Sequence, residues 1–151
     1  MQARRQLDEA IVIFQQRDDK AGLAEAYRQY GLIARIGGAN PDPLVLVLPN
    51  APRHKPSREE LDLSDGYLTR TVALATDAKR FDLVTNANFL LGNNQVLRGD
   101  PHKACPFYDH ALTASREAES QQPGIVVDLP PGVHRIAEGL GRAKSEAGCP
   151  P

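Results

Sequence analysis

A chain of 151 residues, 41% of them hydrophobic and 25% charged, has room for one domain with a real core, and its composition excludes wholesale disorder. Its 18 lysines and arginines balance 19 aspartates and glutamates, so no basic footprint for nucleic acid or an acidic membrane surface is present. The longest wholly apolar run, residues 44–48, is too short to span a bilayer. We therefore expect one domain that recognises its partners by shape.

The 12 prolines divide the chain into segments. Residues 1–40, 57–100, 107–122 and 132–149 contain no proline and are rich in Ala, Leu, Arg, Glu and Gln. Because proline costs about 3 kcal/mol inside a helix, helices are expected in these four blocks. The sequence predicts an all-α fold.

The first block predicts a helical hairpin. Apolar residues recur at helical spacing over 7–14 and again over 23–34. The polar run at 18–22 separates these two stripes, and the glycine pair at 37–38 ends the second.

Two more helices are expected in the second block, one over 61–75 and one from near Asp82 to a stop at Gly99. Asp100 and Pro101 predict the start of the next helix. An aspartate accepts hydrogen bonds from the first free N–H groups, and proline is preset for the first helical position.

That helix should run to about Glu119, and Pro106 lies beyond its first turn. Because Pro106 removes a backbone hydrogen bond, a kink or a widened turn is predicted there. A last amphipathic helix is predicted between Pro131 and Gly148, weakened by two glycines. Its apolar stripe comprises Val133, Ile136, Ala137 and Leu140.

Two apolar segments between prolines, 40–52 and 122–131, do not fit a helix. One interpretation is an extended loop that covers an open end of the helical core. The other is a strand-like arm at 40–56 that pairs with another chain, because unpaired extended segments invite β-addition. The sequence leaves both open.

Residues 89–112 resemble a tetratricopeptide repeat, a helix-turn-helix unit of about 34 residues. In that family a Leu-Gly pair in helix A lets helix B pack closely, and the pair here is Leu91-Gly92. Helix B then carries a small residue, a large ring and a second small residue, which are Ala104, Tyr108 and Ala111. The better repeat covers about 85–119. It departs from the family at three positions, Asn88, Gln95 and Arg116.

Weaker copies of the pattern precede this repeat. Ala10 and Phe14 are spaced like a helix B, and Tyr30-Gly31 resembles the following helix A, whose own helix B would lie near 60–78. About three repeats are normally needed to bury a core. Irregular segments must therefore cap the stack, or its ends must dock on another molecule such as a second copy.

The resemblance implies one domain over 1–151, a short α-solenoid of stacked antiparallel hairpins. Its expected parts begin with a helical hairpin at 1–38 and a proline-rich insertion at 39–56. The helices of the following repeats come next, at 57–120, and a proline-rich segment with the terminal helix and tail comes last, at 121–151.

Tetratricopeptide repeats act as binding scaffolds, so the resemblance implies a non-catalytic adaptor that holds a protein or peptide without a cofactor. Helices A would line a concave groove. Carrying over the register, the groove-facing residues are Glu25, Arg28, Leu32 and Arg35 in the first helix A, and Asn86, Phe89, Asn93 and Val96 in the second.

The two asparagines lie two helical turns apart, and an amide can both donate to and accept from a peptide backbone. Arg28 and Arg35 share that spacing and could clamp carboxylates, or they could form a solvated helix face. The family's clamp for a terminal carboxylate has a lysine where this chain has Phe89, so a chaperone C-terminus is not expected as the ligand.

Other readings of the sequence differ in class. His102, Cys105 and Asp109 share a helix face at a spacing that could hold a metal or pair a thiol with an imidazole, but Cys105 takes a packing position in the repeat. With no nucleophile elbow, phosphate loop or dinucleotide fingerprint, we expect neither an enzyme nor a metal site.

The remaining alternatives concern assembly and location. The chain could self-assemble through the 40–56 arm and its open repeat ends, or be a regulatory or sensor domain of a longer protein. We expect its two cysteines to be reduced and the protein to be cytoplasmic. The alternative is a secreted or periplasmic protein with a Cys105–Cys149 disulfide.

Overall fold

The computed structural model describes residues 2–36, 55–124 and 136–151. Most of the expected 40–56 arm and of the 122–131 segment lies outside these residues. Six α-helices and one short 3₁₀ turn are present in the described part, and no strand is. They are α1 (Gln2–Gln16), α2 (Lys20–Arg35), α3 (Arg58–Asp77), α4 (Phe81–Leu97), the 3₁₀ turn η1 (Pro101–Ala104), α5 (Cys105–Gln121) and α6 (Ile136–Glu146).

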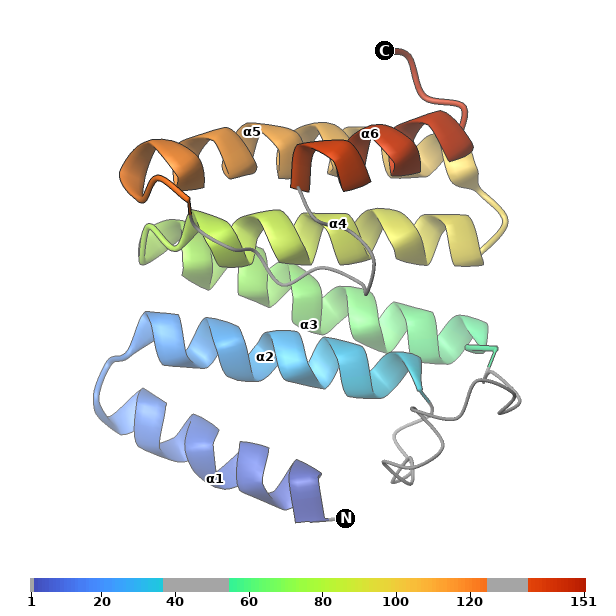
Figure 1. Cartoon of the computed structure of the whole chain (residues 1–151). Helices are drawn as coiled ribbons and strands as arrows, with labels where there is room; N and C mark the ends of the chain where they lie inside the picture. The colour runs from blue at the N-terminus through green and yellow to red at the C-terminus, as the bar shows by residue number, and fades with distance from the viewer. Residues whose placement is uncertain (1, 37–54, 125–135) are drawn as a thin grey trace.

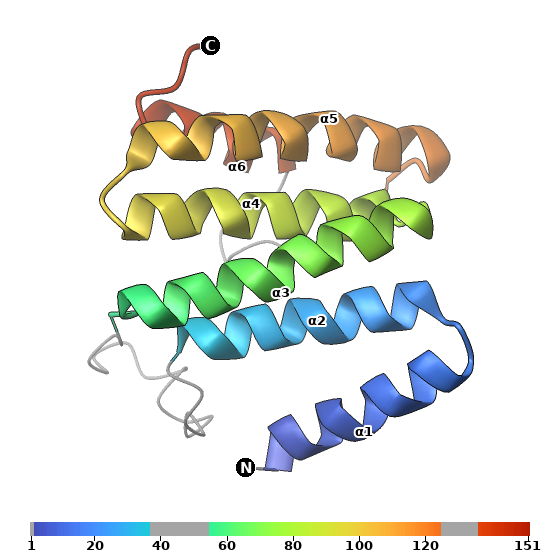
Figure 2. The same ribbon diagram turned by 180° about the vertical axis from the view of Figure 1, so that it is seen from behind.

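Each helix packs against the next along the chain, which gives a stack of antiparallel hairpins. α4 and α6 lie nearer the viewer in Figure 1, whereas α3 and α5 do in Figure 2, so the helices alternate between two layers. α1 lies at one end of the stack and α6 beside α5 at the other. The all-α, repeat-like fold predicted from the sequence is confirmed.

Helix starts follow local capping chemistry. Asp19 Oδ1 accepts a hydrogen bond of 2.9 Å from Gly22 N and begins α2. Before α3, Ser57 Oγ accepts from Glu60 N at 3.2 Å, and Glu60 Oε2 accepts from Ser57 N at 2.7 Å. This reciprocal capping box starts α3 three residues before the apolar stripe on which its prediction was based.

The predicted kink or widened turn at Pro106 rested on a wrong premise, that Pro106 lies beyond the first turn of its helix. The 3₁₀ turn η1 separates Pro101 from α5, so Pro106 lies in the first turn of α5, where a missing N–H costs no helical hydrogen bond. Asp100 also differs from its predicted role. Its side chain makes no capping bond and instead forms an ion pair of 3.1 Å with Lys103 Nζ.

Glycines bring the two layers close together. A Cβ atom at Gly92 would lie 2.5 Å from Tyr108 Cε1, and one at Gly31 would lie 2.8 Å from Leu68 Cδ2. The close approach of helices expected at Leu91-Gly92 is therefore confirmed, and Gly31 does the same in the preceding hairpin.

The same small-large-small pattern fills both pairs of helices. In α5 and η1 the residues facing α4 are the predicted Ala104, Tyr108 and Ala111, all at most 1% exposed. In α3 the corresponding residues have the same spacing and are fully buried: Ser64, Leu68 and Thr71. Because two of these are hydroxyl residues, they need partners, and Ser64 Oγ donates to Gly31 O at 2.8 Å while Thr71 Oγ1 donates to Ala24 O at 3.3 Å. The core lies between the layers, centred on α4, in which eleven residues are buried.

Candidate binding site

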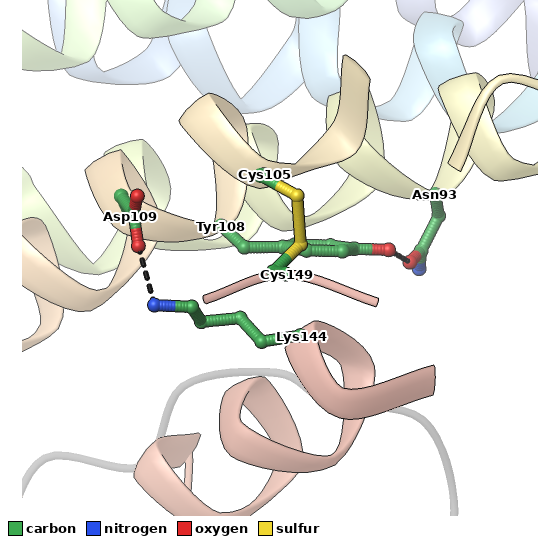
Figure 3. The surroundings of a disulfide bond; sticks show 6 residues. All are labelled: Asn93, Cys105, Tyr108, Asp109, Lys144 and Cys149. Carbon is green, nitrogen blue, oxygen red and sulfur yellow. Dashed lines mark hydrogen bonds and ion pairs between the residues drawn. A yellow bond between two sulfur atoms is a disulfide. The ribbon is translucent and has the colours of Figure 1, made fainter. Parts of the chain in front are cut away.

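A disulfide joins Cys105, the first residue of α5, to Cys149, which follows α6. Their Cα atoms are 5.5 Å apart. The expectation of two reduced cysteines is wrong for this structure, and the alternative pairing is the one present (Figure 3). The expected cytoplasmic location stays a prediction.

α6 is held against the α4–α5 hairpin by a small apolar cluster. Leu140 and Ala147, 1% and 4% exposed, pack with Phe89 and Tyr108. An ion pair of 2.6 Å between Lys144 Nζ and Asp109 Oδ1 adds a polar contact (Figure 3). The predicted stripe of this helix is correct at Leu140, whereas Ala137 is exposed.

A pocket of about 270 Å³ lies between α4, α5 and α6. Three of the predicted groove residues line it, and the rest of its wall comes from α5, α6 and the residue that follows α6. The lining residues are Phe89, Asn93, Val96, Tyr108, Gly139, Arg142, Ala143, Glu146 and Ala147. A mostly apolar hollow with a few convergent polar groups is the usual form of a binding site.

The polar group best placed in this pocket is the amide of Asn93. The phenol of Tyr108 donates a hydrogen bond of 2.7 Å to Asn93 Oδ1, which fixes the amide and leaves Nδ2 as a donor (Figure 3). Within the described ranges Nδ2 has no hydrogen-bond partner. Burial and the Glu146 carboxylate raise the pKa of Tyr108 to about 12, although the Arg35 guanidinium acts in the opposite direction. The phenol therefore keeps its proton at neutral pH.

Three other predicted groove residues contact one another. Arg28 Nε and Nη2 donate to the two carboxylate oxygens of Glu25 at 3.0 and 2.5 Å, and Nη1 donates to Asn86 Oδ1 at 3.3 Å. Although burial opposes the shift, hydrogen bonds from Arg28 and Gln29 hold the pKa of Glu25 below its ordinary value. The forked contact holds Arg28 within α2, and its bond to Asn86 links α2 to α4.

The last two predicted groove residues are also partly covered. Leu32 packs against the buried cluster of Leu68, Ala87, Leu90 and Leu91. Burial lowers the pKa of Arg35, while Asp65 and Tyr108 oppose that shift. Arg35 thus lies close enough to Tyr108 to act on it electrostatically, and the predicted pairing of Arg28 and Arg35 as one clamp is not formed, because Glu25 holds the Arg28 guanidinium.

Sequence reasoning missed the wall contributed by α6. Gly139, Arg142, Ala143 and Glu146 follow an i, i+3, i+4, i+7 spacing that places them on one helix face. That spacing was readable from the sequence, but the sequence of α6 alone does not show that this face turns toward α4.

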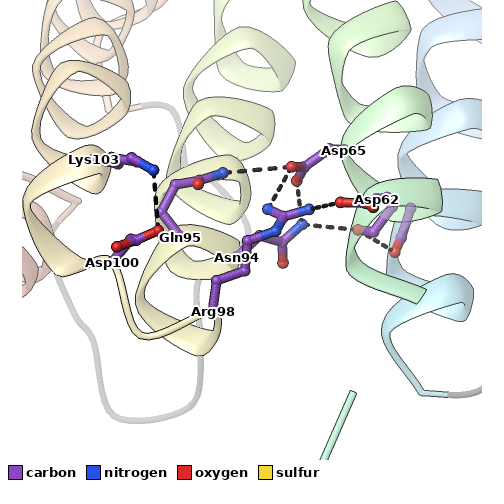
Figure 4. A network of polar contacts seen from close by, with 9 residues as sticks. Asp62, Asp65, Asn94, Gln95, Arg98, Asp100 and Lys103 are labelled. Atoms are coloured by element: carbon purple, nitrogen blue, oxygen red, sulfur yellow. Dashed lines mark hydrogen bonds and ion pairs between the residues drawn. The ribbon is translucent and has the colours of Figure 1, made fainter. Parts of the chain in front are cut away.

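A polar network at the other side of α4 ties it to α3 (Figure 4). Asp65 accepts from Asn94 Nδ2 at 2.7 Å and from Arg98 Nη1 at 2.6 Å, and Arg98 Nη2 reaches Asp62 Oδ1 at 2.6 Å. Asn94 is fully buried, so this network fixes the rotation of α4 about its axis. It therefore helps to set which residues of α4 face the pocket.

The alternative site at His102, Cys105 and Asp109 is not assembled. Cys105 is bonded to Cys149, and Asp109 is paired with Lys144. Across residues 2–36, 55–124 and 136–151, no three His, Cys, Asp or Glu side chains are grouped so as to hold a metal ion. In the same ranges no helix combines the length and apolar character needed to cross a membrane.

Fold and pocket together define an all-α helical stack with a candidate binding site between α4 and α6. Comparison of the chain with known protein families, with curated proteins and with solved structures finds no match.

Proposed function

We propose that this chain is a non-catalytic scaffold of the tetratricopeptide type, which binds an extended peptide segment of a partner protein along α4 and α6. One apolar side chain of the peptide enters the pocket. The observation that carries the proposal is the pocket itself, about 270 Å³ in volume and lined by Phe89, Asn93 and Val96 at the positions where the repeat register places ligand contacts.

The chemistry of the pocket suits a peptide. Phe89, Val96 and Ala143 offer an apolar surface, and Asn93 Nδ2 is a fixed donor for a backbone carbonyl beside it. The volume lies below the roughly 300 Å³ at which pockets for whole drug-sized ligands begin. A single side chain, with its backbone held at the rim, is the occupant that fits.

A matched pair of variants tests the proposal. Val96 and Leu97 are neighbours at the end of α4, each 42% exposed, and only Val96 lines the pocket. Peptides would be selected from a random display library on the full chain, and their dissociation constants measured by fluorescence anisotropy. We expect Val96→Asp to weaken binding by about tenfold or more, since truncating or charging a central contact costs over about 1.4 kcal/mol.

Leu97→Asp should leave the dissociation constant within about twofold, as expected for a residue outside the contact. Equal losses in both variants would contradict the proposal, and so would a library that yields no peptide.

A second candidate function, self-assembly, is favoured by α1. Val12 and Ile13 are 51% and 46% exposed on the helix at one end of the stack. If a second copy covers them, light scattering of the full chain should show a dimer, and Val12→Asp with Ile13→Asp should return it to a monomer. A monomeric parent chain would contradict this candidate.

A further inference from the structure

The proposed peptide site has a wall that belongs to the last helix. Gly139, Ala143 and Glu146 line the pocket from α6, opposite the residues of α4. α6 has only 11 residues, two of them glycine. An isolated helix shorter than roughly 12–15 residues is marginal in water, and glycine weakens it further. The wall therefore exists only while α6 is docked.

Non-covalent contacts hold α6 weakly. Its described apolar anchor is Leu140, assisted by the small side chains of Ala143 and Ala147. The ion pair joins Lys144, whose side chain is 15% exposed, to Asp109, whose side chain is 59% exposed. Water around the Asp109 carboxylate screens the pair and limits its contribution. Within the described ranges a covalent attachment adds to these contacts, through Cys149 three residues beyond the helix.

The disulfide is placed to control this docking. It joins the C-terminal end of α6 to the start of α5, beside the buried ring of Tyr108 that forms the floor shared by the cluster and the pocket. Cys105 and Cys149 are both only partly buried, so a thiol from solution can approach them. The α4–α5 hairpin has contacts that involve neither cysteine, among them the close approach of Gly92 to Tyr108.

We propose, on the basis of the proposed function, that the Cys105–Cys149 disulfide is a redox latch of the peptide site. When it is oxidised it holds α6 as the second wall of the pocket. When it is reduced it releases α6 and opens the site. The reductant is a dithiol. One of its thiolates attacks a sulfur of the disulfide and displaces the other as a thiolate, which takes up a proton. Its second thiol then displaces the bound cysteine. The reductant leaves as a cyclic disulfide, and Cys105 and Cys149 each end as a thiol.

The test uses the full chain in three forms: oxidised, treated with a dithiol reductant, and Cys105→Ser with Cys149→Ser. Hydrogen exchange of the α6 amides and the dissociation constant of a selected peptide are measured on each. We expect faster exchange throughout α6 in the reduced and serine forms, with α2–α5 still protected. Peptide affinity should fall about tenfold or more, because the typical contribution of a disulfide exceeds the free energy that corresponds to that factor.

The two proposals fail in different ways. If the oxidised chain binds no peptide, the proposed function is lost, and the exchange measurement still decides the latch. Unchanged protection of α6 after reduction overturns the latch, as does equal peptide affinity in all three forms. Loss of protection across α2–α5 overturns it as well, because the disulfide would then support the whole fold. A reductant effect that persists in the serine form would show that the effect does not pass through these cysteines, which is a further contradiction.

Discussion

The phenolic oxygen of Tyr108 lies 2.7 Å from Asn93 Oδ1, and the ring of the same tyrosine fills the space that a Cβ atom would need at Gly92. One side chain thus serves both the packing of α5 on α4 and the orientation of the polar group in the pocket. Packing and binding can be separated at this residue by removing its hydroxyl group alone.

Tyr108→Phe should keep the ring packed against Gly92 and lose the hydrogen bond to Asn93. We expect the free energy of unfolding to fall by about 1 kcal/mol, because Asn93 is only half-buried and recovers part of its hydrogen bonding from water. Peptide affinity should fall too, since the amide is no longer fixed. Urea denaturation and anisotropy titration measure the two effects. Tyr67→Phe, at a ring that stacks on Tyr30 with centroids 5.0 Å apart, is the control and should leave peptide affinity unchanged.

Gly92→Ala should destabilise the chain by about 1–3 kcal/mol, because the added methyl group overlaps the ring of Tyr108 at 2.5 Å. Gly66→Ala, on α3 with no heavy atom within 4 Å of the new Cβ, should instead stabilise it by about 0.5–1 kcal/mol through helix propensity. The denaturation midpoints of the two variants, each compared with that of the parent chain, measure these changes. A Gly92→Ala chain as stable as its parent would show that the two helices are not in close contact.

The fold was largely predictable because its signals are local. Proline exclusion and apolar spacing located each helix, and the Leu91-Gly92 pair indicated where α5 packs on α4. Errors arose where a single side chain changes the outcome. The capping box at Ser57 moved the start of α3, and η1 moved Pro106 into a first turn.

The site was predictable only in part. Helical register correctly grouped Phe89, Asn93 and Val96, because one helix places them on one face. The i, i+3 spacing of Glu25 and Arg28 was readable from the sequence, but register could not show that Arg28 also bonds Asn86, because that contact joins two helices. Nor could it place α6 as a wall, because that contact depends on long-range packing around Leu140 and on the disulfide.

Arg28→Lys tests the role that the structure gives to this arginine. Lysine cannot make the forked contact with Glu25 and reach Asn86 together, so we expect a loss of about 1–2 kcal/mol in stability. Peptide affinity should change little, because Arg28 does not line the pocket. Arg70→Lys, at an exposed cation–π contact over Tyr27, is the control and should be nearly neutral in stability. A strong loss of peptide affinity in Arg28→Lys would contradict this structural role and indicate that Arg28 contacts the peptide.

Alkaline pH should destabilise the fold through Tyr108. Burial is the first cause of its raised pKa, about 12 in the fold against 10.0 ordinarily. The folded state therefore binds more protons than the unfolded state between these values. The resulting stability is fully present below pH 10 and is lost as the pH rises toward 12. The urea midpoint should fall across this window in the parent chain and fall less in Tyr108→Phe. Equal slopes would contradict the assignment.

The central claim is that a peptide occupies the pocket between α4 and α6. The most direct measurement is NMR of the isotope-labelled, oxidised full chain titrated with a selected peptide. The account predicts the largest amide shifts in Phe89–Val96 and in 139–147, and little change in α1. Shifts confined to α1, or to the outer surface of α3, would contradict it.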